Sequence, residues 1–107
     1  MTLTELLTAL NGTEIPFTAY RWDKAPAAPY GTVQLEGGAD SAAGDGMIIH
    51  QAVRGSIDLY APNHNSRWPQ AVQTAINGQV AWRLNSVQYE DAPRIVHYEW
   101  IFETEGL

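Results

Sequence analysis

The sequence predicts an α+β domain in which a mostly antiparallel sheet of four to five strands carries two helices on one face. Two segments have apolar residues at helical spacing, and several others alternate apolar and polar residues at strand spacing. The segments follow the order helix, strands, helix, strands. A sheet with one apolar face buries two amphipathic helices most simply on that face. The length of 107 residues fits a single domain.

The first helix is predicted near the start of the chain from a stripe of leucines at i, i+3, i+4 and i+7: Leu3, Leu6, Leu7 and Leu10. Thr2 or Thr4 supplies its N-cap. The pair Asn11-Gly12 supplies a left-handed residue that ends it.

The second helix is predicted within residues 63–78, where Ser66 is a candidate N-cap and Pro69 lies in the first turn. Its apolar stripe consists of Trp68, Val72, Ala75 and Ile76. Asn77-Gly78 ends this helix.

Five segments read as strands: 15–22, 30–37, 47–61, 79–91 and 92–104. Along the third, Ile49, Val53, Ile57 and Leu59 share one face, and the other face carries His50, Arg54, Ser56 and Asp58. In the last strand, His97 and Glu99 take the face opposite Trp100. The fourth strand changes phase near Asn85-Ser86, which predicts a β-bulge there.

The stretch "GGADSAAGDG" at residues 37–46 contains four glycines and little that could be buried. This composition predicts a flexible, solvated loop before the longest strand. A phosphate-binding loop is excluded because the GxxxxGK[ST] lysine is missing and a strand, not a helix, follows.

Charge excludes several functions. Twelve Asp and Glu against six Lys and Arg give a net charge of −6, and the cations are scattered, so DNA is not expected to bind.

The start "MTLTELLTAL" lacks the basic region of a signal peptide, and no apolar run approaches a membrane span. We expect a soluble, non-secreted protein. The absence of cysteine removes disulfides and thiolate chemistry.

Catalytic chemistry has weak candidates. His50 and His97 lie on polar strand phases and, with Asp58 or Glu99, could form a site of two histidines and one carboxylate. No HExxH or HxH spacing and no nucleophile elbow supports an enzyme. We therefore expect no catalytic residues, metal or cofactor. A small metal-dependent hydrolase remains a distant alternative.

Taken together, the order of motifs resembles the tail terminator, or tail completion, proteins of long-tailed bacteriophages. After the short helix comes an "IP-x-x-x-Y" entry at Ile15 to Tyr20, then a Pro-rich approach from Pro26 to Tyr30. A Gly/Asp/Ala loop and a strand ending in "I-x-L-Y" at Ile57 to Tyr60 follow. The closing strand matches at Tyr98, Phe102 and Glu103.

The resemblance implies a structural virion protein that forms a ring, commonly hexameric, on the head-proximal end of the tail tube. The ring stops tube polymerisation and docks to the head connector or stopper protein, after assembly in the host cytoplasm. DNA passes through without binding. A head-completion or stopper subunit, or another minor virion subunit of the neck, is the nearest alternative.

Two candidate contact regions follow from this resemblance. The predicted loop would bind the tube or head connector through Gly37, Gly38, Asp40, Ser41, Gly44, Asp45 and Met47. The polar phase of the long strand would form the contact between subunits through His50, Arg54, Asp58 and Tyr60. Arg54 and Asp58 can pair there with opposite charges on a neighbouring copy.

Overall fold

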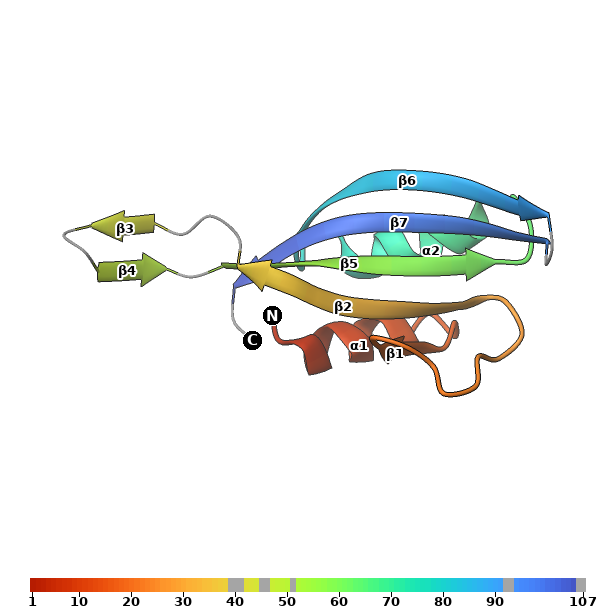
Figure 1. Cartoon of the computed structure of the whole chain (residues 1–107), viewed down its shortest axis with the longest axis horizontal. Helices are drawn as coiled ribbons and strands as arrows, with labels where there is room; N and C mark the ends of the chain where they lie inside the picture. The colour runs from red at the N-terminus through yellow and green to blue at the C-terminus, as the bar shows by residue number, and fades with distance from the viewer. Residues whose placement is uncertain (39–41, 45–46, 51, 92–93, 106–107) are drawn as a thin grey trace.

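A computed structural model describes residues 1–38, 42–44, 47–50, 52–91 and 94–105 (Figure 1). Its elements in chain order are α1 (Leu3–Asn11), β1 (Phe17–Ala19), β2 (Tyr30–Gly38), β3 (Ala42–Gly44), β4 (Met47–His50), β5 (Ala52–Ala61), α2 (Arg67–Ile76), β6 (Ala81–Asp91) and β7 (Arg94–Glu105). The molecule is elongated, with extents of 52 × 27 × 23 Å.

Five strands form one sheet in the order β1-β2-β5-β7-β6, and β3 and β4 form a separate two-stranded sheet. All neighbouring strands of the larger sheet are antiparallel except β1 and β2, which are parallel. The predicted α+β class with a mostly antiparallel sheet is confirmed.

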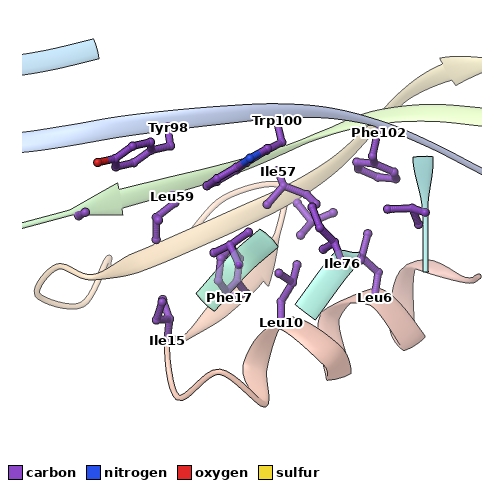
Figure 2. Packing of buried hydrophobic residues seen from close by; sticks show 14 of the residues in the cluster. Leu6, Leu10, Ile15, Phe17, Ile57, Leu59, Ile76, Tyr98, Trp100 and Phe102 are labelled. Atoms are coloured by element: carbon purple, nitrogen blue, oxygen red, sulfur yellow. The ribbon is translucent and has the colours of Figure 1, made fainter. Parts of the chain in front are cut away.

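Both helices pack on one face of this sheet, as predicted. The core joins residues of α1 and α2 to alternate residues of the central strands β5 and β7, and Figure 2 shows Ile57, Trp100 and Phe102 directed toward Leu10 and Ile76. Fully buried members include Leu6, Leu10, Ile57, Leu59, Ile76, Val96, Trp100 and Phe102. The strand alternation in the sequence therefore assigned the buried face of β5 and β7 correctly.

Helix α1 begins at a capping box in which Glu5 N–H donates to Thr2 Oγ1 and Thr2 N–H donates to Glu5 Oε1. Its end differs from the prediction, because Gly12 has φ −65° and the left-handed residue is Glu14, with φ 71°. The Asn11 side chain instead fixes the exit by pairing with both backbone groups of Phe17.

The strand predicted over residues 15–22 is much shorter, Phe17–Ala19. Left-handed backbone at Glu14 and at Tyr20, where φ is 66°, brackets the extended segment and turns the chain at both ends. In addition, β1 pairs only with Gly31–Val33 of β2, so the ladder has three rungs.

Helix α2 starts after Ser66, but the Ser66 side chain makes no cap bond. Asn65 Oδ1 accepts from Arg67 N–H instead, so the predicted N-cap is displaced by one residue. The helix ends at the predicted Asn77-Gly78 pair, where Gly78, with φ 79°, has left-handed backbone. The bulge predicted near Asn85-Ser86 is confirmed by a register shift between Leu84 and Ser86.

The prediction of a loop over residues 37–46 is wrong for the residues that the structure describes, because these lie in strands. Gly37 and Gly38 belong to β2 and pair with Arg54 and Val53. Ala42–Gly44 forms β3, which pairs with β4. The strand predicted over residues 47–61 is accordingly divided between β4 and β5, because the first part pairs with β3 in a hairpin. Figure 1 shows this hairpin extending past the end of the larger sheet.

Candidate assembly surfaces

The sheet face opposite the helices, here called the open face, is covered by no helix among the described residues (Figure 1). Strand register arranges its side chains in rows. One row runs through Tyr30, Tyr60 and His97, and the next through Thr32, Asp58 and Glu99. A third runs through Gln34, Ser56, Ile101 and Arg83.

Asp58 is buried on this face, with 7% of its surface exposed, although the sequence predicted a contact with a neighbouring copy. His97 Nε2 lies 2.7 Å from Asp58 Oδ1, and Ser56 Oγ donates to Asp58 Oδ2 at 3.4 Å. Asp58 therefore has partners within the chain, and its predicted contact with a neighbouring copy stays a prediction. Its carboxylate is already engaged within the chain, since the sheet brings β7 beside β5.

An aromatic stack covers one end of the open face. Tyr60 lies between Tyr30, at 5.0 Å between ring centroids, and His97, at 4.4 Å. Trp22 meets Tyr30 edge to face at 6.5 Å, and its Nε1–H donates to Gly31 O. Tyr60 was predicted as an interface residue, but its ring already stacks on Tyr30 and on His97 within the chain.

The His97–Asp58 pair is electrostatically biased toward its charged form. The hydrogen bond to Asp58 raises the pKa of His97, burial opposes this, and the charges of Asp58, Glu90 and Glu99 add to the increase. Burial, followed by the charge of Asp58, raises the pKa of Tyr60.

This arrangement can hold a proton but does not activate a nucleophile. The Ser56 hydroxyl is bonded to Asp58 and not to His97, and Ser56 is fully buried. A nucleophile needs its own hydrogen bond to the general base. The chemistry that the geometry supports is a charge-assisted pair that ties β7 to β5.

Replacing His97 with glutamine is expected to reduce stability in a pH-dependent way. A raised folded-state pKa means that His97 stabilises the protein below its ordinary pKa of about 6.5 and that this contribution disappears as pH rises through the folded-state value. Urea unfolding at pH values from 5.5 to 8.5 should show the largest wild-type advantage at the acidic end. An advantage that grows with pH would contradict the assignment.

The two histidines of the hydrolase alternative do not converge. His50 lies in β4 and pairs with Ala42, whereas His97 pairs with Tyr60 near the other end of β5. The two histidines therefore lie in different sheets, and Figure 1 shows β4 beyond the start of β5, opposite the end where His97 pairs. Within the described part of the chain, no group of three or more His, Asp or Glu side chains could hold a metal ion.

The remaining predicted contact residues are distributed as follows. Arg54 is exposed and lies on the row between Gly37 and Glu103, so its role between subunits stays a prediction. Gly44 and Met47 belong to the β3–β4 hairpin. Asp40, Ser41 and Asp45, which were predicted to contact a partner, lie outside the described residues.

Strand β6 carries an exposed apolar surface that the sequence did not predict. Leu84, Val87 and Tyr89 are 45%, 49% and 52% exposed, and they lie on the helix side of the sheet. Trp82 continues the stripe and lines a groove of about 280 Å³ beside α2. We call Trp82, Leu84, Val87 and Tyr89 the β6 stripe. Their regular phase predicts burial, but Leu84, Val87 and Tyr89 remain about half exposed, whereas Trp82 is partly buried against the core.

The two edges of the larger sheet are open. No described strand pairs with the outer side of β6 or, beyond the three residues that face β1, with the outer side of β2 at Gln34–Gly38. Such edges present unpaired backbone donors and acceptors, which natural proteins normally cover, charge or shorten. Here the middle of β6, from Leu84 to Tyr89, carries no charge.

Comparison with known proteins leaves the class open: no protein-family model matches this chain, and no curated protein matches it at a significant level. Among the described residues, neither helix is long and apolar enough to cross a lipid bilayer. The open edges and the β6 stripe are therefore the main guide to function.

Proposed function

We propose that this chain is the subunit of a ring at the head-proximal end of a phage tail tube, where it ends tube polymerisation and provides the head-docking surface. The observation that supports this most is the β6 stripe beside an open strand edge. Three large apolar side chains, about half exposed on the uncharged middle of one edge strand, are typical of a surface that another protein covers.

The positions of the open edges support a ring. They are at opposite sides of one sheet, so a copy can offer β6 to one neighbour and β2 to the other. A contact between two different patches is heterologous, and it closes into a ring when the rotation per copy allows. The placement of such a ring on a tail tube rests on the motif resemblance described above.

The β3–β4 hairpin is suited to the contact along the ring axis. It extends the molecule past the end of the sheet, in the direction of the strands (Figure 1). Copies arranged side by side through β2 and β6 would therefore all direct their hairpins to one side of the ring. That side would meet the tube or the head connector, which is the role expected for residues 37–47.

The net charge of −6 fits a conduit for DNA better than a DNA-binding surface. A negative ring repels the phosphates that pass through it. The same charge supports the expectation that DNA is cargo and not a ligand.

A head-completion or stopper subunit is the alternative role, and the same edges would serve its assembly. Incubating the purified protein with isolated tail tubes and, separately, with DNA-filled heads distinguishes the two roles. A tail terminator should appear by negative-stain microscopy as a ring on one end of the tubes and should halt their elongation. Binding to heads alone would favour the stopper role, and binding to neither would contradict both.

Replacing residues 39–52 by Asn-Gly is expected to abolish docking while leaving the domain folded. Gly38 and Val53 are paired neighbours, so a two-residue turn can join β2 to β5 directly. Tube capping by this variant, measured by co-sedimentation, should fall to background. A shortened protein that caps tubes as well as the wild type would show that the hairpin is not the docking element.

A further inference from the structure

We propose that the sheet of one copy continues into the next, with the first part of β6, residues 81–83, pairing with the outer side of β2 at residues 34–38 and with Arg83 beside Gln34 and near Glu36. This inference rests on the proposed ring and names the contact that closes it. The occupant of the β6 edge is thus a second copy of this chain.

Strand direction permits this pairing. β2 and β7 run toward the hairpin end of the sheet, whereas β5 and β6 run away from it, since each successive pair from β2 to β6 is antiparallel. Rotation about an axis roughly parallel to the strands preserves these directions. The β6 of one copy would therefore meet the β2 of the next in the antiparallel sense.

The two segments also lie at the same level of the sheet. Gln34, Ser56, Ile101 and Arg83 form one row, and Leu35, Gly55, Phe102 and Trp82 form the next. Neighbouring copies without an axial shift would thus place Arg83 beside Gln34 and Trp82 beside Leu35.

Side-chain chemistry matches on both faces. On the open face, Glu36 lies near Gln34, with 3.5 Å between the Gln34 amide nitrogen and a Glu36 carboxylate oxygen, so its charge is in the row that Arg83 would enter. Both Glu36 and Arg83 are exposed. On the helix side, the partly buried apolar side chains of Trp82 and Leu35 would meet. The interface would therefore combine an ion pair on the open face with an apolar contact on the helix side.

The uncovered part of the β2 edge and the regular part of the β6 edge also end at the same level of the sheet. β1 covers β2 only up to Val33, and this leaves a step in that edge. Val33 shares its row with Leu84, and the β6 bulge begins directly after Leu84. A bulge bends its strand, so β6 can pair with β2 before this row and change direction where the neighbour's β1 begins.

Charge reversal tests the pairing. Arg83→Glu and Glu36→Arg should each raise the concentration for half-assembly at least about tenfold, because each places like charges across the contact. The double variant, Arg83→Glu with Glu36→Arg, should assemble like the wild type. Native mass by light scattering gives the readout, with tube co-sedimentation as a second one. Lys24→Glu, the same charge change at an exposed site off both edges, is the matched control.

An equimolar mixture of the two single variants gives a sharper test. If the variants alternate, every β6 edge meets a β2 edge of opposite charge, so the mixture should assemble although neither variant does alone. The pairing would be overturned if Arg83→Glu alone assembled at the same concentration as the wild type. It would also be overturned if the mixture of the two variants failed to assemble. A wild-type chain that forms no multimer either free or on tubes would overturn it too.

The interface and the proposed function can fail separately. Rings that respond to these charges but never bind tail tubes or heads would leave the interface intact and remove the virion role. Tube-capping rings that ignore both charge reversals would keep the virion role and remove this interface.

Discussion

Replacing Gly55 with alanine is expected to lower the free energy of unfolding by about 3 kcal/mol or more. Gly55 lies in the central strand β5, where an added Cβ would clash with the backbone oxygen of Gln34 and lie 2.8 Å from Phe102 Cζ. The first is a backbone atom of the paired strand, and the second belongs to a fully buried ring. Neither can move without disturbing the sheet or the core.

Thermal unfolding followed by circular dichroism measures this effect. At about 4–8 °C per kcal/mol, the melting temperature should fall by at least about 12 °C. Gly38→Ala is the matched control, since nothing lies within 4 Å of a Cβ at that position. The control should stay within about 0.5 kcal/mol of the wild type. Equal melting temperatures for the two variants would contradict the packing described around β5.

Replacing Trp100 with alanine is expected to cost about 3–5 kcal/mol. Trp100 is fully buried at the centre of β7, between the sheet and the helices (Figure 2). Its Nε1–H donates to Gln73 Oε1 of α2 at 3.1 Å, so the substitution removes a large side chain and a bond between sheet and helix together. This is a large part of the about 5–15 kcal/mol that stabilises a typical domain.

Trp100→Phe separates the two contributions. It keeps most of the apolar volume but deprives Gln73 of its donor. Because Gln73 is only partly buried, the lost hydrogen bond should cost about 0.5–1.5 kcal/mol. Chemical denaturation should therefore rank the wild type above Trp100→Phe and Trp100→Phe above Trp100→Ala. An alanine variant as stable as the wild type would contradict the central place of Trp100 in the core.

The features that the sequence predicted well are those with local causes. The leucine stripe of α1, the alternation along β7 and the phase change in β6 each appear in consecutive residues. A helix or strand converts such spacing directly into one buried face. For the same reason, the antiparallel α+β class could be predicted before any tertiary contact was known.

The errors concern contacts between distant segments. Alternation placed Asp58 on the solvent-facing or partner-facing side of its strand, but its carboxylate contacts His97, 39 residues away. The division of the long strand into β4 and β5 likewise depends on pairing with β3. No spacing within residues 47–61 reveals either contact.

The β6 stripe was missed for a related reason. Trp82, Leu84, Val87 and Tyr89 have the spacing of buried residues, and they do face the helix side. Whether a helix covers them depends on the position of α2 under the sheet, which sequence spacing does not determine. A surplus of large aromatic residues over what a small core holds was the available signal.

The assembly of the wild-type protein tests the central claim most directly. Its native mass should be measured by light scattering over a wide concentration range, with negative-stain images of the largest species. We predict closed rings with a mass that is a whole multiple of 11.8 kDa. A protein that stays monomeric at every concentration, and that forms no ring on isolated tail tubes, would contradict the account.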